Sequence, residues 1–125
     1  MTSATHTSLV ERQVRGFNNS SLEDVVAGYA DNARLVLVSA HTLPGHELVV
    51  EGREAIEKHI SRVLRGGIAD VEVDWLAAGD GFVAWRDHGT FWGSTPFSES
   101  HTAAVDGDGL ITEHVIHSVY QLPAK

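Results

Sequence analysis

The strongest chemical signal in the chain is a pair of histidines in its last predicted strand. The turn sequence Asp-Gly-Asp-Gly at 106–109 opens a long run of β-forming residues that carries His114 and His117. Histidine titrates near neutral pH, so it can act as a general acid or a general base. Successive side chains of a strand alternate between its two faces. The two histidines therefore have opposite parity, and only one can face a pocket unless a bulge intervenes.

A second pair of chemically useful side chains lies on an upstream strand, predicted at 82–92. Arg86 and His88 are two residues apart, so they share one face of that strand. On a pocket face, His88 would serve as general base or acid, and Arg86 would stabilise an oxyanion or orient a carboxyl group. The alternative is an exposed polar face, with Trp85 and Asp87 turned the other way.

His101 lies on the next predicted strand, where its own face is mostly apolar. Phe97, Ala103 and Val105 share that face, and Glu99 is the polar exception. A histidine in such a place is either an acid/base group in a pocket or a core side chain satisfied by one hydrogen bond. Both interpretations stay open at this point.

The sequence indicates no metal site and no cofactor. The chain contains no cysteine, which excludes cysteine-based zinc sites, disulfides and thiolate nucleophiles. His46-Glu47 resembles the start of the zincin helix motif, but the second histidine is missing because position 50 is Val50. No Gly-x-Ser-x-Gly motif of a serine hydrolase occurs. Two histidines on neighbouring strands with one acid could still bind zinc or non-haem iron, and that alternative stays open.

The composition is that of an acidic globular protein. The 125 residues carry a formal net charge of −8, with 42% hydrophobic and 21% charged residues. Nucleic acids and anionic membranes require a basic surface, so neither is an expected partner. No apolar run reaches membrane-spanning length, and the first residues lack a secretory signal. We therefore expect a cytoplasmic location and a single domain over 1–125, with a flexible segment up to about residue 7 that includes His6.

The elements that must position these side chains follow from the periodicity of apolar residues. A helical stripe covers 9–17, and Ser21 begins a second helix with apolar positions over 22–30. A β-rich run at 33–39, a third helix at 52–64 and four strands with period two follow. Helices segregated from antiparallel strands indicate an α+β fold: a twisted sheet of about five strands with one face covered by three helices.

Short motifs at the junctions of these elements resemble those of a known superfamily. Val-Glu-Gly-Arg-Glu-Ala-Ile-Glu at 50–57 opens the third helix, and Asp-Gly-Leu-Ile at 108–111 opens the last strand. Ile-Thr-Glu-His at 111–114 is similar to a stretch that often begins that strand in the family. Together they resemble the nuclear-transport-factor-2-like superfamily, in its SnoaL-like branch with polyketide cyclases, ketosteroid isomerases and limonene epoxide hydrolases. The resemblance implies a cone-shaped α+β barrel, with a curved, mostly antiparallel sheet wrapped on three helices around an apolar pocket, and frequently a homodimer.

Two positions depart from the catalytic members of that branch. Cyclases and epoxide hydrolases commonly carry an aspartate midway along the last strand, where this chain has Ile116. Limonene-type epoxide hydrolases place Arg-x-Asp on the third strand, and the matching stretch here keeps Arg86 but ends in His88. These departures argue against a hydrolase that activates water with two aspartates, and they leave a site built on histidine open. The resemblance also places His114 inside the pocket, whereas hydrophobicity alone would bury the valine face that carries His117.

The resemblance and the aromatic residues together indicate a substrate pocket. Dehydratases of the superfamily use a tyrosine from the end of the second helix, so Tyr29 is a candidate hydrogen-bond donor to a substrate carbonyl. Packing of Tyr29 in the core is the alternative. Trp85 and Trp92 offer large surfaces for a planar ligand or a dimer interface, and Ile116 would line the pocket. His59 lies on the apolar stripe of the third helix and is interpreted as structural.

The sequence therefore predicts an enzyme that binds an apolar, aromatic or polyketide-like molecule in a conical pocket. The predicted chemistry is cofactor-free cyclisation, isomerisation or dehydration. His88 and His101 would exchange protons, Arg86 would steady developing negative charge, and His114 would support one of the two histidines. The alternative is a non-catalytic ligand-binding or dimerisation module of the same fold.

Overall fold

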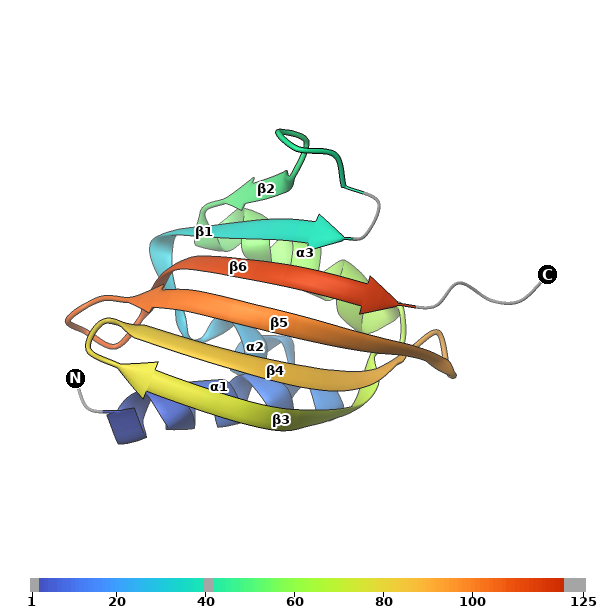
Figure 1. Cartoon of the computed structure of the whole chain (residues 1–125), viewed down its shortest axis with the longest axis horizontal. Coiled ribbons are helices and arrows are strands. Elements are labelled where there is room, and N and C mark those ends of the chain that lie inside the picture. The colour runs from blue at the N-terminus through green and yellow to red at the C-terminus, as the bar shows by residue number, and fades with distance from the viewer. Residues whose placement is uncertain (1–2, 40–41, 121–125) are drawn as a thin grey trace.

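The computed structural model describes residues 3–39 and 42–120, and within them the chain forms three helices and six strands (Figure 1). In chain order they are α1 (Ser3–Asn18), α2 (Leu22–Val26), β1 (Tyr29–Ser39), β2 (Leu48–Glu51), α3 (Arg53–Arg65), β3 (Ala69–Gly79), β4 (Phe82–Phe91), β5 (Thr95–Val105) and β6 (Ile111–Tyr120). This is the α+β class that the sequence predicted. None of the helices in the described part is long and apolar enough to cross a lipid bilayer.

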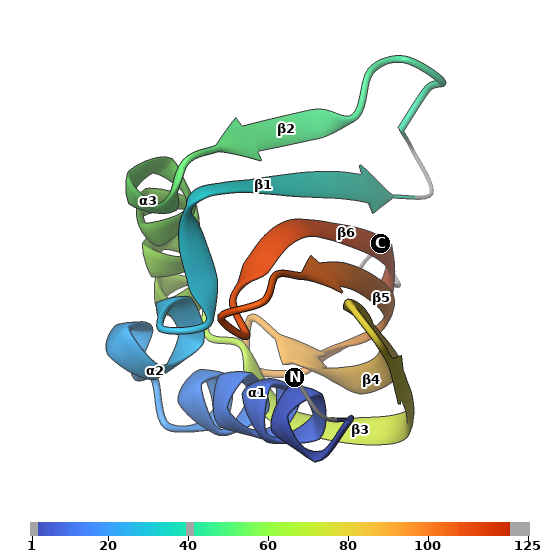
Figure 2. The ribbon, with the colours of Figure 1, turned by 90° about the vertical axis from the view of Figure 1, so that its left-hand side faces the viewer.

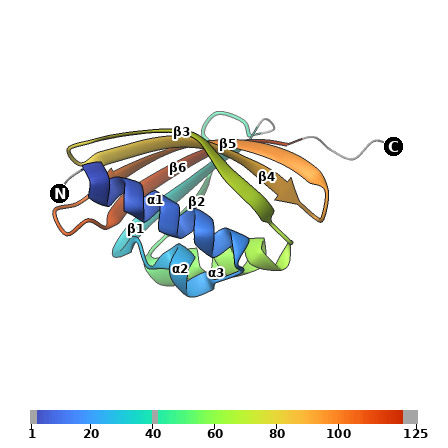
Figure 3. The same cartoon turned by 90° about the horizontal axis from the view of Figure 1, so that it is seen from below.

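All six strands belong to one curved sheet in the order β2-β1-β6-β5-β4-β3. Neighbours pair antiparallel, except that β1 and β6 run parallel. The three helices lie on the same side of the sheet (Figure 3). Seen from the end, the sheet curls so that β3 and β4 bend toward α1, while β1 runs beside α3 (Figure 2). The concave face of the sheet is thus the face that packs on the helices.

The curvature of the sheet has identifiable local causes. The register of β3 against β4 shifts between Val73 and Trp75, as at a β-bulge, and a bulge bends a strand and increases its twist. Gly89 on β4 permits a close approach of its neighbours. A Cβ atom at that position would lie 2.8 Å from the Phe97 ring and 2.9 Å from the Ala69 carbonyl oxygen. A larger side chain at 89 would therefore push the adjacent strands apart.

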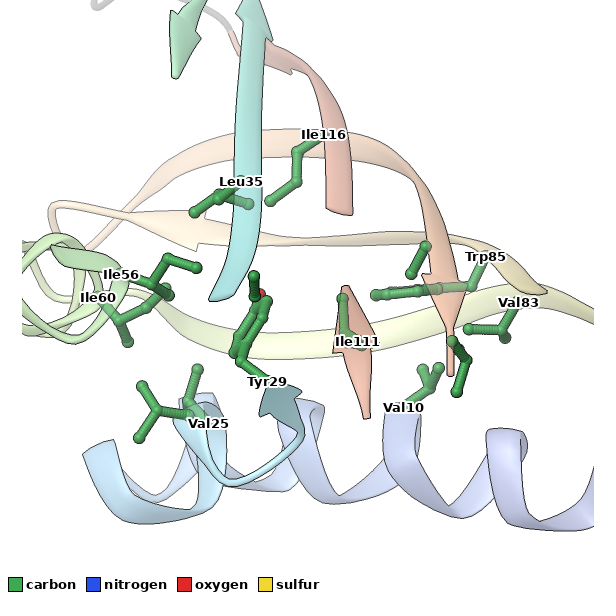
Figure 4. Packing of buried hydrophobic residues seen from close by; sticks show 14 residues of the cluster. Val10, Val25, Tyr29, Leu35, Ile56, Ile60, Val83, Trp85, Ile111 and Ile116 are labelled. Atoms are coloured by element: carbon green, nitrogen blue, oxygen red, sulfur yellow. The ribbon is translucent and has the colours of Figure 1, made fainter. Parts of the chain in front are cut away.

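The apolar core fills the concave side of the sheet (Figure 4). α3 presents Ile56 and Ile60 one turn apart, and both are buried. α1 contributes Val10, while Val83 and Ile111 close the layer from the strands. Burial of this apolar surface is the main favourable contribution to folding. It also decides which face of each strand points inward.

The second helix is shorter than the sequence predicted. Ser21 is its N-cap, as expected, and the Ser21 hydroxyl accepts a hydrogen bond from the Asp24 amide at 3.3 Å. The helix has only five residues, however, and Tyr29 is the first residue of β1 instead of a helical residue. The Ile111 amide donates to the Gly28 carbonyl oxygen over 2.7 Å. Pairing with β6 therefore overrides the helical stripe that continues through this segment.

Two further features differ from the prediction. α1 already begins at Ser3 and His6 is fully buried, whereas a flexible segment was expected up to about residue 7. Met1 and Thr2 lie outside the described residues. The strand β2 occupies a stretch predicted as loop, and it gives the sheet a sixth strand instead of five. With four residues at the sheet edge, β2 is too short to show a period-two pattern.

Candidate functional site

The inner face of β4, β5 and β6 carries polar side chains that lie in register. Three inward-facing rows cross the strands: Asp87–Glu99–Ser118, Trp85–His101–Ile116 and Val83–Ala103–His114. Members of a row lie directly opposite one another, and successive rows share a face because they are two residues apart. Strand pairing thus brings three distant segments into one cluster under the helices.

Four buried side chains form a continuous chain of contacts through this cluster. The Gln13 amide nitrogen on α1 lies 3.2 Å from the Tyr29 hydroxyl oxygen. That oxygen lies 2.7 Å from His114 Nδ1, and His114 Nε2 lies 2.9 Å from His101 Nδ1. Buried polar groups are tolerated when they are paired. These hydrogen bonds link side chains from four elements: α1, β1, β6 and β5.

One direction of donation accounts for every hydrogen bond between the members of this chain. The Gln13 amide nitrogen also lies 3.4 Å from the Val25 carbonyl oxygen, which can only accept, so this nitrogen donates to both neighbours. Tyr29 then donates its O–H to His114 Nδ1. His114 donates its Nε2–H to His101 Nδ1, and His101 carries its own proton on Nε2. The chain therefore sets the tautomer of both imidazoles.

His101 Nε2 faces two carboxyl groups. It lies 3.1 Å from Asp87 Oδ2 and 3.6 Å from Glu99 Oε1, without a well-aligned hydrogen bond to either. Ser118 donates its hydroxyl to the other oxygen of Glu99 over 2.7 Å. Asp87 Oδ1 is buried and has no hydrogen-bond partner among the described residues. The chain thus ends at two acids that share one imidazole N–H.

Burial shifts the ionisation of this cluster toward uncharged forms. Desolvation raises the pKa of Glu99 above its usual 4.5, against an opposing contribution from His101. Desolvation, with a smaller contribution from His101, lowers the pKa of His114 well below 6.5. Burial likewise raises the pKa of Tyr29. At neutral pH, His114 and Tyr29 are therefore neutral, and Glu99 holds a proton more readily than an exposed glutamate does.

Two hollows adjoin the cluster, and Glu99 lines both of them. The inner cavity has a volume of about 30 Å³, enough for a water molecule, and its polar lining consists of Gln13, Tyr29, Asp87, Glu99, His101 and His114. The second hollow, which we call the mouth pocket, is open and has a volume of about 520 Å³. Its lining consists of Leu37, Val38, Ser39, Thr42, His46, Leu48, His59, Arg62, Val63, Gly66, Phe91, Trp92, Glu99 and Ser118. A volume in this range suits a small organic molecule.

Three of the four residues predicted to bind substrate line one of the two hollows, and Trp85 lines neither. Trp92 lies where β4 ends, is 60% exposed and lines the mouth pocket. Trp85 is buried instead and stacks on the His101 ring, with centroids 4.4 Å apart and planes inclined by 4°. It holds the imidazole in place. Tyr29 and Ile116 line the inner cavity, so only a group small enough to enter it could touch them.

Arg86 and His88 lie on the outer face of the sheet, so the predicted acid/base pair is not in a pocket. The His88 side chain is 48% exposed, and its nitrogens lie 2.8 Å from Asp74 and 3.6 Å from Glu72. Arg86 is exposed as well. The cause is strand parity, because the alternating neighbours of both residues on β4 take the inner positions. The sequence left this arrangement open as the alternative.

The two histidines of β6 point in the directions that the resemblance implied. His114 is 1% exposed and lies inside, and His117 is exposed on the outer face. The prediction that favoured His114 is therefore confirmed as to orientation. Sequence reasoning did not single out Glu99, Asp87 and Gln13 as site residues. Glu99 could have been found, because it shares the strand parity of His101.

A divalent cation could find ligands in this cluster. One donor atom from each of Asp87, Glu99 and His101 lies within 4.8 Å of the others, and carboxylate with imidazole suits zinc or non-haem iron. A metal on His101 Nε2 would move the imidazole proton to Nδ1 and reverse the hydrogen-bonded chain. Tyr29 would then accept from both Gln13 and His114, and its own O–H would lose its acceptor. The direction of the chain thus favours a proton at Nε2.

Comparisons with known proteins identify the fold. No protein-family model matches the chain, and no curated protein matches it in sequence. Among crystal structures, an NTF-2-like protein of unknown function from Burkholderia xenovorans aligns with a TM-score of 0.77 at 11% identity, over 98% of this chain and 88% of that one. A SnoaL-like protein of unknown function from Burkholderia thailandensis gives 0.68 at 18% identity, over 98% and 99%. A Kribbella flavida protein with a provisional assignment as a ketosteroid isomerase gives 0.71 at 17%, over 98% and 82%.

This chain has the NTF2-like fold. The curved sheet wrapped on three helices, expected from the short motifs, is therefore confirmed, and other neighbours are described by the related term cystatin-like. The identities are low, so the likeness concerns the fold alone. NTF2-like proteins differ in what their concave side holds, and the function must be argued from the site.

Proposed function

We propose that this NTF2-like protein is an enzyme that binds a small apolar molecule in the mouth pocket and moves a proton on it with Glu99, without a cofactor. The observation that carries the proposal is the position of Glu99. Glu99 lines both the mouth pocket and the inner cavity, and burial raises the pKa of its carboxyl group. A carboxylate with a raised pKa is a stronger base near neutral pH than an exposed one.

The chemistry is an acid/base cycle on one carboxyl group. The ionised Glu99 takes a proton from an acidic C–H of the substrate and becomes a carboxylic acid. In an isomerisation the same proton returns to a different carbon atom. In a dehydration it goes to the hydroxyl group that leaves as water. In either case Glu99 ends in the state in which it began, so no cofactor is consumed.

The remaining polar side chains are positioning residues. His101 Nε2–H lies 3.6 Å from Glu99 Oε1 and favours the ionised form of that carboxyl group. His114 and Tyr29 hold the His101 proton on Nε2 through the directed chain. Asp87 lies 3.1 Å from the same nitrogen and places a second carboxyl group beside it. This arrangement replaces the predicted roles of His88 and Arg86, which lie on the outer face.

The test uses nitrobenzisoxazole, a planar apolar probe whose ring opens when a base removes its C–H proton. The wild-type protein is expected to open the ring with a rate that rises as a group with a pKa above 4.5 ionises. Glu99→Gln should lower kcat/KM by about 10²–10⁴-fold. Glu113→Gln, an exposed glutamate on β6, is the matched control and should leave the rate unchanged. Equal rates for wild type and Glu99→Gln would refute the assignment.

A non-catalytic ligand-binding module is the second candidate. It is favoured by Ile116, an apolar side chain that faces the inner cavity where the family resemblance implies an aspartate in catalytic members. The same probe separates the two functions. Saturable binding of nitrobenzisoxazole with no ring opening by the wild-type protein would favour the module.

A further inference from the structure

The mouth pocket is chemically different at its two ends. Glu99 and Ser118 lie at its inner end, because Glu99 also belongs to the inner cavity and Ser118 donates to it. Phe91 and Trp92 contribute aromatic side chains to the wall of the mouth pocket. In the described part of the chain, three basic side chains also line the pocket, and we call them the basic rim: His46, His59 and Arg62.

Arg62 is the permanent charge of the basic rim. It is exposed on α3, and no carboxylate of the described residues lies within ion-pair distance of its guanidinium. Glu54 and Glu57 line a neighbouring surface hollow with Arg62, but Glu54 pairs with Lys58 at 3.8 Å. Arginine keeps its charge in proteins, and its planar fork matches a carboxylate through two parallel hydrogen bonds. An anion in the mouth pocket would therefore meet a cation that has no competing ion pair.

The histidines of the basic rim add hydrogen bonds without adding a second permanent charge. His59 on α3 is half-buried, and its burial, with a contribution from Arg62, lowers its pKa. A neutral imidazole has one donor and one acceptor nitrogen, so it can hydrogen-bond a bound anion. His46 lies exposed in the loop between β1 and β2. The basic rim thus combines one permanent positive charge with two imidazoles that can hydrogen-bond a bound anion.

The basic rim stands out against the charge of the whole molecule. The protein carries a net charge of −8, so its overall field repels anions. Among the described residues that line the mouth pocket, the one acid is Glu99, at the inner end. A cation at this mouth is therefore a local feature rather than part of a basic surface.

We propose that the ligand of the mouth pocket is a monoanionic carboxylic acid with an apolar, planar body. The carboxylate binds Arg62 with hydrogen bonds from the rim histidines, the body packs on Trp92 and Phe91, and the far end of the body reaches Glu99. This inference rests on the function proposed above for the same pocket. The rim would bind the ligand in one direction, so that only the end remote from its carboxylate meets the base.

The test compares naphthoate with naphthamide, which has the same ring system and no charge. Binding to the full chain is measured by calorimetry at low and moderate salt. Wild type should bind naphthoate about 10-fold or more tightly than naphthamide, because charge-assisted hydrogen bonds are the strong ones. Arg62→Gln should abolish this preference and leave the affinity for naphthamide unchanged. Arg65→Gln, on the same helix but not among the mouth-pocket residues, should keep it.

Equal affinities of wild type for the two probes, or a preference that survives Arg62→Gln, would overturn the inference. Tighter binding of naphthyl phosphate than of naphthoate would overturn the choice of a monoanion. The Glu99→Gln variant separates failure of the proposed base from failure of the proposed carboxylate site. If Glu99→Gln still opens nitrobenzisoxazole and the wild-type protein binds naphthoate more tightly than naphthamide, Glu99 is not the base, whereas the carboxylate site at the basic rim is supported. If Glu99→Gln no longer opens nitrobenzisoxazole and the wild-type protein binds naphthoate and naphthamide equally, Glu99 is supported as the base and the carboxylate site is refuted.

Discussion

The two faces of the sheet use histidine in opposite ways, although β4, β5 and β6 supply both faces. On the inner face, His101 and His114 are 5% and 1% exposed and bond to each other at 2.9 Å. On the outer face, His88 and His117 are exposed, and the His88 ring nitrogens contact the acids of β3 in solvent. The residue type is the same, and one step along a strand exchanges the two environments.

The two faces differ in whether water can replace the hydrogen-bond partners of their histidines. Water can solvate His88 and its acidic partners when they separate, so exposed ion pairs contribute little to stability. Water cannot easily replace a partner of His114, because its ring is buried among Tyr29, Trp85 and His101. A buried donor or acceptor left without a partner keeps its full desolvation cost. The inner histidines should therefore control both stability and chemistry, and the outer ones neither.

The largest expected effect on stability separates the two histidines of β6. His114→Ala leaves the Tyr29 hydroxyl and His101 Nδ1 unpaired in a buried cavity. It should lower the free energy of unfolding by about 3 kcal/mol or more. His117→Ala, three residues away on the outer face, should change it by less than about 0.5 kcal/mol. Urea unfolding of both variants measures the difference, and equal losses would remove the distinction between the faces.

Tyr29→Phe tests the hydrogen bond between Tyr29 and His114 with a smaller change, and nitrogen NMR of the wild-type protein tests the direction of that bond. The variant keeps the ring but removes the proton that Tyr29 donates to His114 Nδ1. We expect a loss of about 1–2 kcal/mol in unfolding free energy. Nitrogen NMR of the wild-type protein should show His114 protonated on Nε2 and unprotonated on Nδ1. A wild-type His114 with its proton on Nδ1 would contradict the assigned direction.

The pH dependence of stability should trace to a histidine of the inner face. The lowered pKa of His114 means that the folded protein binds fewer protons than the unfolded chain just below 6.5. Stability attributable to this group is complete above 6.5 and falls as the pH drops toward the folded-state pKa. Thermal unfolding at several pH values should show this acid loss in wild type and in His117→Gln. His114→Phe, with a ring that does not titrate, should have a flatter profile below 6.5, and an unchanged profile would exclude His114 as its source.

The smallest effect is expected on the outer face. His88→Gln removes the contacts with Asp74 and Glu72, which are 2.8 Å and 3.6 Å long and exposed to solvent. The unfolding free energy should fall by less than about 1 kcal/mol, and added salt should shrink the difference further. The variant should also open nitrobenzisoxazole at the wild-type rate. A large loss of rate would restore His88 to the site.

The sequence predicts the arrangement of the fold better than the make-up of the site. Period two over the last strands and the motifs at 50–57 and 108–111 are local signals, and they indicate the sheet and its family likeness correctly. Tyr29 continues a helical stripe, but its pairing with Ile111 is a contact across the fold that no local pattern contains. β2 is too short to carry a pattern of its own.

The predictions of site residues were right or wrong for a related reason. β4 has polar and aromatic residues on both faces, so its parity could not be assigned, and Arg86 and His88 were placed inside. The face of His101 was clear because three of its neighbours are apolar. The importance of Glu99 comes from burial between the two hollows, and Gln13 joins the chain from α1. The inward face of Glu99 follows from its strand parity with His101, but its burial and the contact of Gln13 depend on packing that the sequence does not display.

The most direct measurement is the pKa of the Glu99 carboxyl group, followed by carbon NMR in the full chain and assigned by comparison with Glu99→Gln. A base at the inner end of the mouth pocket, desolvated and placed beside His101, predicts a titration midpoint above 4.5. Exposed Glu113 on β6 serves as the internal reference. A Glu99 midpoint at or below 4.5 would contradict the proposal that this carboxyl group is the acid/base residue of the protein.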